Sequence, residues 1–422
     1  MRNILKTILA ILARLTLSRF KPRVIGITGS VGKTSAKEAI TLALSSKFKV
    51  RSSFENYNNE LGLPLSAIGE YSGGRSFLSW IFVVIKGFAK LFGANYPQVL
   101  VLEMGSDRPG DIEYLLSVAG KLDAAVVTDI GISHLEFFRS PEALAKEKLS
   151  IFKGLNREGT VVANFDSPKV REGLKSARTN VLTYGFDQGA SLYASDFQIL
   201  KKDNSFGANF KIHYEGTVVP IFLPNALGLP AAYCALAAAA VGVAFGLNLV
   251  DISASLRDFT PPPGRLRLLT GIKQTKILDD TYNSAPSSTL AALETLKAVG
   301  GSRLIAALGE MAELGSASEE GHRAVAVKIL ESGIQAVFLV GDKTKLIADE
   351  LKKRRFPGQV FWFVDSDSAG IPIQNYLQPA DAILIKGSQS MRMEKIVKEI
   401  MAEPLKAEQL LVRQTKKWLD KP

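Results

Sequence analysis

The chain has 422 residues, enough for two or three domains, and its apolar fraction of 46% is ordinary for a protein with buried cores. The formal net charge of +11 favours anionic partners. No Lys/Arg-rich run with interleaved aromatic residues indicates a nucleic-acid surface, so we expect an anionic membrane surface or anionic small substrates and no nucleic acid. The single cysteine, Cys234, excludes an internal disulfide and fits a reducing compartment.

Residues 1–20 place apolar side chains at helical spacing among four cations and no acid. The segment is too short and too interrupted to span a bilayer, and no clear signal-peptide cleavage site follows it. Two interpretations stay open: a helix packed on the body of the protein, or a basic amphipathic helix lying on a membrane. A second apolar stretch, 77–92, lies in an insertion at about 74–95 and is also short for a span. The two stretches either pack together or form one membrane-facing patch.

An apolar run at 24–25, a glycine-rich turn and a helix start follow one another directly. Glycines let backbone N–H groups approach a polyphosphate, and a helix N-terminus adds partial positive charge. A lysine in this turn adds a full charge, and the next hydroxyl can bind Mg²⁺. The turn therefore predicts an ATP site formed by Gly29, Ser30, Val31, Gly32, Lys33, Thr34 and Ser35.

Short apolar strands alternate with helices along the rest of the chain, which predicts an α/β protein with mostly parallel sheets. Alternating polarity at 191–222 predicts an antiparallel excursion, and the prolines and glycine at 261–264 predict a domain boundary. We expect a helix at 1–22, an ATP-binding domain at 23–263 and a C-terminal domain at 264–422. The expected strands are 98–102, 124–128, 160–164, 276–279, 303–308, 336–340, 360–364 and 382–385, and the expected helices include 142–155 and 229–245.

Glu103 and His134 each follow a predicted strand. Ligands of open α/β sheets bind at the carboxyl ends of strands, so both side chains are expected near the phosphate-binding turn. There a carboxylate can hold Mg²⁺ and a neutral imidazole can join it. The alternatives are a solvated acid and a histidine that is merely hydrogen-bonded. Lys148 lies in a predicted helix and by itself indicates only a surface lysine.

Eight motifs occur in order between about residues 23 and 399. They are Gly26-x-Thr28-Gly29-x-x-Gly32-Lys33-Thr34-Ser35, Asn58-Asn59-x-x-Gly62-x-Pro64, Glu103-Met104-Gly105 with Arg108-Pro109-Gly110, His134-Leu135-Glu136, Lys148-x-x-Ile151-Phe152, Asp279-Asp280-Thr281-Tyr282-Asn283, Gly309-Glu310-Met311-Ala312-Glu313-Leu314-Gly315 and Lys386-Gly387-Ser388-x-Ser390-Met391-Arg392-Met393-Glu394. Together they resemble the Mur ligase family, ATP-dependent amide-forming enzymes of peptidoglycan synthesis. The motifs that begin at Asp279 and at Lys386 look most like those of the MurF-type members. These members join D-alanyl-D-alanine to a UDP-N-acetylmuramoyl-tripeptide.

The resemblance implies a P-loop central domain with a parallel sheet and a C-terminal Rossmann-like α/β domain. It also implies that a substrate carboxylate attacks the γ-phosphate of ATP, and that an amine then displaces phosphate from the acyl phosphate. Lys33 and the loop amides would hold the phosphates, Thr34 and Glu103 one Mg²⁺, and Glu103, His134 and Lys148 a second. In the family the lysine that matches Lys148 is carbamylated by CO₂, which makes it a metal-binding carboxylate.

Further roles follow from the resemblance alone. Asn283 resembles the residue that contacts adenine, and Arg265 a linker arginine near the nucleotide. Asp279 and Asp280 either belong to the site or cap turns. The implied substrate-binding residues are Asn59, Arg108, Lys386, Ser388 and Arg392, of which the last three are candidates for binding the carboxylate of the amine substrate.

The resemblance departs at the front, because only about twenty residues precede the phosphate-binding turn, too few for the family's UDP-gripping domain. Our hypothesis is that the stretches 1–20 and 77–92 replace that domain, by packing or by holding the enzyme at a membrane near a lipid-linked substrate. We expect a monomeric cytoplasmic ligase that acts in cell wall biogenesis, and thus in cell shape and division. If the two stretches hold it at a membrane, the enzyme is peripheral to the inner face of that membrane. Its partners would be a muramoyl-peptide acceptor and a dipeptide amine.

Two other functions are weighed against this one. The first is a related amide ligase with a different or lipid-linked acceptor. The second is a nucleotide-binding regulator on a degenerate ligase fold, against which the presence of Lys33, Glu103, His134 and Lys148 argues.

Overall fold

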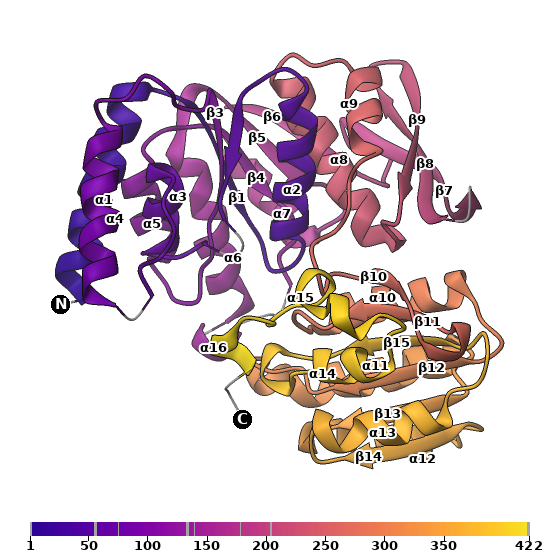
Figure 1. Ribbon diagram of the computed structural model, residues 1–422. Helices are drawn as coiled ribbons and strands as arrows, with labels where there is room; N and C mark the ends of the chain where they lie inside the picture. Colours follow the sequence, from indigo (N-terminus) through magenta and orange to yellow (C-terminus); the bar gives the residue numbers. More distant parts are fainter. Residues whose placement is uncertain are drawn as a thin grey trace.

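The computed structural model describes residues 2–54, 57–74, 76–131, 135–138, 140–177, 179–202 and 205–419. In this part of the chain two α/β domains are built, each on its own mostly parallel sheet (Figure 1). The α/β class predicted from the alternation of apolar strands and helices is confirmed.

The N-terminal domain contains, within the described residues, a nine-stranded sheet of order β2-β3-β1-β4-β5-β6-β7-β8-β9. Its strands are parallel from β2 to β7, and β8 and β9 complete it as antiparallel neighbours, as the alternating pattern predicted. The strands are β1 (Arg23–Thr28), β2 (Val50–Ser52), β3 (Val99–Glu103), β4 (Leu122–Val127), β5 (Leu155–Asn164), β6 (Asn180–Gly185), β7 (Leu192–Lys202), β8 (Ser205–Tyr214) and β9 (Thr217–Pro224).

Helices cover both faces of this sheet. One face packs against α2 (Lys33–Ser45), α8 (Gly228–Ala244) and α9 (Leu249–Leu256), where the alanines of α8 let it approach α2 closely. The other face packs against a second group, and α4 rests on α1 within it. That group comprises α1 (Arg2–Phe20), α3 (Gly62–Ile68), α4 (Phe77–Lys90), α5 (Asp111–Ala119), α6 (Pro141–Leu149) and α7 (Pro168–Gly173).

The C-terminal domain contains a six-stranded sheet, counted over the described residues, of order β10-β11-β15-β12-β13-β14. Only β10 runs antiparallel to its neighbour. The strands are β10 (Arg267–Thr270), β11 (Lys276–Asp280), β12 (Leu304–Gly309), β13 (Ala336–Val340), β14 (Gln359–Phe363) and β15 (Ala382–Lys386). One face of the sheet packs against α10 (Pro286–Val299), α11 (Ser318–Glu331) and α12 (Lys345–Lys353). The other face packs against α13 (Ser366–Tyr376), α14 (Glu394–Ile400) and α15 (Ala407–Leu410), and α16 (Lys416–Leu419) follows.

The predicted elements differ from the structure mainly at their ends. The helix predicted at 142–155 is too long: α6 ends at Leu149, a short 3₁₀ helix covers Ser150–Gly154, and Leu155 already belongs to β5. The strand expected at 160–164 is only the second half of that strand. Apolar residues continue through this region, so the pattern alone did not mark where the helix gave way to the strand.

The N-terminal segment packs on the body of the protein, as the first of its two interpretations predicted; the membrane interpretation stays a prediction. Helix α1 buries one face, including Leu9 and Ala13, against α3 and α5, while Ile4 and Leu15 on the opposite side are exposed. No helix in the described part of the chain is long and apolar enough to cross a bilayer.

Candidate active site

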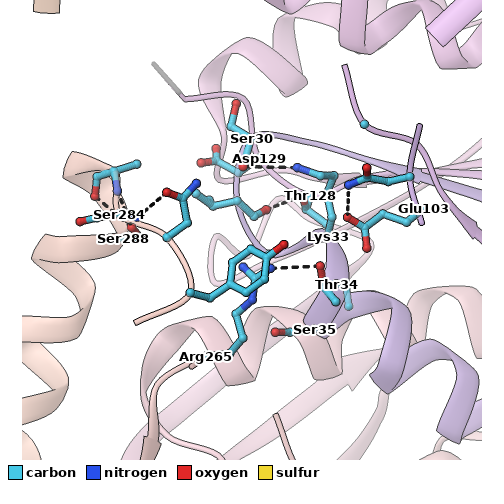
Figure 2. Close-up of a pocket in the computed structure, with 18 of the residues that line it drawn as sticks. Ser30, Lys33, Thr34, Ser35, Glu103, Thr128, Asp129, Arg265, Ser284 and Ser288 are labelled. Atoms are coloured by element: carbon cyan, nitrogen blue, oxygen red, sulfur yellow. Dashed lines mark hydrogen bonds between the residues drawn. The ribbon is translucent and has the colours of Figure 1, made fainter. Parts of the chain in front are cut away.

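A cavity of about 1520 Å³ lies between the two domains, where β1 and β3 end. Figure 2 shows Lys33, Thr34 and Glu103 on one side of it and Ser284 and Ser288, from the C-terminal domain, on the other. Pockets for one small ligand typically enclose about 300 to 1000 Å³. This cavity therefore has room for a nucleotide and a second substrate.

The glycine-rich turn joins β1 to α2 at the wall of the cavity. Gly29 has a φ of +148°, and a Cβ atom there would lie 2.0 Å from Oγ1 of Thr128. Gly32, with a φ of +85°, immediately precedes α2. Gly32, the N-cap residue of α2, provides no side-chain cap, so the N-terminus of the helix offers free N–H groups and partial positive charge. Only glycine permits this backbone path, and the path suits a phosphate group.

Lys33 lies over the turn, where its Nζ donates a hydrogen bond to the carbonyl oxygen of Gly29 at 2.7 Å. Burial lowers the pKa of the Lys33 ammonium, and the negative charge of Glu103 acts against that change. Ser30, Val31, Thr34 and Ser35 also line the cavity, whereas Gly29 is not among the lining residues and contacts Lys33 through its carbonyl oxygen. The predicted phosphate-binding residues thus form one wall.

Arg265 links the C-terminal domain to this wall. Its Nη2 donates to Oγ1 of Thr34 at 3.1 Å, and its guanidinium lies 3.8 Å from the centre of the Tyr282 ring. The buried Nε of Arg265 has no partner among the described residues. In this position the positive guanidinium would offset the negative charge of a polyphosphate bound at the turn.

Glu103 ends β3 with its side chain in the cavity wall and is 1% exposed. Its Oε1 accepts a hydrogen bond from Nδ2 of Asn58 at 3.0 Å. Its buried Oε2 has no hydrogen-bond partner in the described part of the chain. An unpaired carboxylate oxygen is costly to bury, and a cation would satisfy it. With the Thr34 hydroxyl on the same cavity wall, this oxygen fits a Mg²⁺ site.

Lys148 is buried, not solvated as its sequence context alone indicated: it is 1% exposed, and its Nζ donates to Oγ of Ser106 at 3.0 Å. Burial lowers the pKa of Lys148 to about 7, and the positive charge of Lys33 adds to the effect. Near neutral pH the amine is therefore partly unprotonated. His134 lies outside the described residues, so its metal-binding role stays a prediction. In the described residues no three His, Cys, Asp or Glu side chains cluster as a metal site.

The predicted substrate residues of the N-terminal domain lie at the same cavity. Arg108 is exposed there. Asn59 also lines the cavity, but its Oδ1 accepts hydrogen bonds from the N–H groups of Leu61 and Gly62, at the start of α3. Its neighbour Asn58 is the residue that contacts Glu103.

The predicted residues of the C-terminal domain are held by internal contacts at the opposite wall. Nζ of Lys386 donates to Oδ2 of Asp280 at 2.6 Å and to the carbonyl oxygen of Asn283 at 2.9 Å. Oγ of Ser388 accepts from the N–H of Ala312, and Nε of Arg392 donates to Glu394.

The two aspartates and Asn283 make structural contacts as well. Asp279 accepts hydrogen bonds from the N–H of Gly264 and from Thr281, as the turn-capping alternative predicted. Burial raises the pKa of Asp279 to about 6. Asn283 lines the cavity, and its Oδ1 accepts from the N–H of Ser284.

Comparison with known proteins identifies the family. The Mur ligase middle domain matches residues 86–242, and the Mur ligase glutamate ligase domain matches residues 264–389. The chain is 31% identical over 403 residues, 94% of its length, to the UDP-N-acetylmuramoyl-tripeptide–D-alanyl-D-alanine ligase of Bacillus subtilis, of which it covers 80%. The chain belongs to the Mur ligase family.

Two further relatives of this Mur ligase agree with the assignment. The ligase of the same name from Escherichia coli is 29% identical over 384 residues, which is 90% of this chain and 76% of that one. The crystal structure of the MurF ligase from Thermotoga maritima in complex with ADP superposes with a TM-score of 0.77 at 26% identity, covering 93% of this chain and 83% of that one. This Mur ligase is an ATP-dependent enzyme that forms C–N bonds.

Sequence reasoning missed three residues that shape the Mur ligase site. Asn58 orients Glu103, Ser106 contacts Lys148, and Thr128 donates through Oγ1 to the carbonyl oxygen of Val31 at 2.6 Å. Asn58 stands in a motif already singled out, and Thr128 ends a predicted strand. Their positions were available from the sequence, but their contacts were not.

Proposed function

We propose that this Mur ligase adds a D-alanyl-D-alanine dipeptide to the carboxylate of a muramoyl-tripeptide, as a step of peptidoglycan precursor synthesis. The identity to MurF-type relatives over almost the whole chain supports this substrate pair. The observation that carries the chemistry is the unpaired Oε2 of Glu103 in the cavity wall that also contains Lys33 and Thr34.

The proposed reaction has two steps. A carboxylate oxygen of the acceptor attacks the γ-phosphorus of ATP, the bond to the β-phosphate oxygen breaks, and ADP leaves. The unprotonated amine of the dipeptide then attacks the acyl carbon, and the bond to the phosphate oxygen breaks; the amine loses its proton to solvent. Lys33, Arg265 and the N-terminus of α2 bind and orient the triphosphate, because the repulsion between two anions must be offset before they meet.

Two Mg²⁺ ions would be held by Thr34, Glu103, His134 and a carbamylated Lys148. When bound, they supply charge neutralisation between the phosphate and carboxylate oxygens. The lowered pKa of Lys148 supports the modification, because only an unprotonated amine attacks CO₂ to give a carbamate and a proton. Before modification the lysine side chain does not fit a metal. Asn283 is proposed to contact adenine, and Asn59, Arg108, Lys386, Ser388 and Arg392 the two substrates.

A second candidate function is amide formation on a different or lipid-linked acceptor. The observation that favours it is the N-terminal turn of α1, whose Arg2, Asn3 and Lys6 line the cavity. Lys6 offers a positive charge for an anionic part of the acceptor, and Arg2 lies beside it in an ion pair with Glu60.

Phosphate release measured across pairs of acceptors and amines tests the proposal. We expect ATP cleavage that requires both a UDP-muramoyl-tripeptide and D-alanyl-D-alanine, and that is not supported by L-alanyl-L-alanine. Cleavage only with a lipid-linked or peptide-free acceptor would favour the second candidate. No cleavage with any pair would overturn both.

A further inference from the structure

Helix α4 exposes most of its apolar side chains. It lies beside α1 at the outer edge of the N-terminal domain (Figure 1). Its buried residues are Val83 and Gly87, and a Cβ atom on Gly87 would come within 2.9 Å of Ile68 and 3.6 Å of Leu12. This close approach anchors one narrow stripe of the helix on α1 and α3. The opposite stripe is left exposed and consists of Leu78, Ile81, Phe82, Ile85 and Phe88.

Helix α1 extends the same apolar surface. Its exposed large apolar side chains recur at helical spacing on the side away from the sheet, and they are Ile4, Ile8, Ile11 and Leu15. We call these residues, together with the exposed stripe of α4, the α1–α4 face. Patches of this kind on a folded chain mark a surface that contacts a partner.

The charges that α1 and α4 themselves carry are of one sign. Helix α1 carries four cations, helix α4 carries two, and neither contains Asp or Glu. Arg19, Lys21 and Lys86 are exposed at its margins. Two of the six cations are already paired with acids, Arg2 with Glu60 and Lys90 with Glu70, so the excess positive charge comes from the other four. The partner must therefore offer apolar surface bordered by negative charge.

We propose that the α1–α4 face docks this protein on an anionic lipid bilayer, with both helices lying in the plane of the interface. A bilayer supplies acyl chains for the phenylalanines and isoleucines and phosphate groups for the surrounding cations. A second copy of the chain fits less well, because a symmetric contact would bring these cations against their own equivalents.

Docking in this way brings the active-site cavity to the membrane. The exposed Ile4 and the cavity-lining Arg2 and Lys6 belong to the same end of α1. An acceptor held in the headgroup layer then lies next to the cavity mouth. Docking would therefore explain how a membrane-attached acceptor reaches the active site; this consequence rests on the proposed ligase function.

Co-sedimentation with vesicles tests the docking. The full chain is mixed with large unilamellar vesicles of phosphatidylcholine alone or with added phosphatidylglycerol. We expect binding to the anionic vesicles that weakens as salt is raised. The double variant Leu78→Glu/Ile85→Glu should bind about tenfold less, because it places two charges where apolar side chains would be buried.

The matched control is Ile371→Glu/Leu405→Glu in the C-terminal domain. Ile85 and Ile371 are 57% and 60% exposed, and Leu78 and Leu405 are 67% and 99% exposed, so both variants replace surface residues of the same types. We expect the control to bind like the unaltered protein, and both variants to keep the same circular dichroism spectrum and melting temperature.

Three results would overturn the docking proposal. They are no binding to anionic vesicles, equal loss in the control variant, and a dimer in sedimentation equilibrium that Ile85→Glu dissociates. The vesicle measurement needs no substrate, so its result is independent of the result of the ligase assay. If the protein binds vesicles but has the same kcat/KM for a lipid-attached acceptor as for a free one, the docking proposal is kept and only its link to catalysis is overturned.

Discussion

Lys148→Met separates the cost of burying this lysine from its role in the reaction. Methionine has nearly the same length as lysine and carries no charge. It therefore fills the same space without the free-energy cost of removing a charged group from water. The lysine is 1% exposed, and burial lowers its pKa from 10.5 to about 7. The unfolded chain holds the proton more tightly than the folded chain, so the protonated lysine destabilises the fold.

The size of the effect follows from the two pKa values. A drop from 10.5 to about 7 corresponds to about 5 kcal/mol, since each pKa unit is worth about 1.36 kcal/mol. The full penalty is present below pH 7, where both states are protonated. Between pH 7 and 10.5 the unfolded state binds more protons, so the stability of the unaltered protein rises with pH. We therefore expect Lys148→Met to be more stable by several kcal/mol at pH 6, with an advantage that shrinks by about 4 kcal/mol by pH 10.

Urea unfolding of the ligand-free protein in CO₂-free buffer measures this difference at each pH. Lys146→Met is the control, because Lys146 is exposed on the same helix. Its stability relative to the unaltered protein should not vary with pH over this window. A difference between Lys148→Met and the unaltered protein that is also independent of pH would refute the reasoning, since it would mean that the buried amine titrates like a free lysine.

Three other predictions concern the reacting groups. Lys33→Ala should lower ATP-dependent phosphate release by about 10²-fold or more while circular dichroism stays unchanged, because the γ-phosphate loses its cation; unchanged turnover would remove Lys33 from the phosphate site. Glu103→Gln keeps an acceptor for Asn58 and removes the unpaired charge, so the ligand-free melting temperature should hold or rise while Mg²⁺-dependent turnover is lost. Lys148→Ala should be inactive and partly restored by short carboxylates such as acetate that replace a carbamate; full activity without additives would exclude Lys148 from the metal site.

The strands and the phosphate-binding turn could be predicted because their signals are local. Strand-like runs of four to six residues gave β13 at its observed limits and β11, β12, β14 and β15 within one residue. The glycine spacing around residue 32 gave the turn before α2. These features depend on periodicity and backbone freedom, which a single sequence displays.

The contacts between distant segments could not be predicted. Lys386 and Asp280 face each other because β15 and β11 pair in the register that aligns these two residues, and a sequence does not display register. Likewise, two neighbouring asparagines in one loop have different roles, since Asn59 accepts from the N–H of Gly62 at the start of α3 and Asn58 contacts Glu103. The buried Lys148 donates a hydrogen bond to Ser106, which lies on the loop after β3 rather than on the helix of Lys148.

The transfer of an oxygen atom tests the central claim most directly. If the cavity brings a carboxylate to the γ-phosphate of ATP, an acceptor labelled with ¹⁸O in its carboxylate must pass one labelled oxygen to the released phosphate. Mass spectrometry of that phosphate after one round of amide formation should show a single ¹⁸O atom in each molecule. Unlabelled phosphate, formed together with the amide, would contradict the account.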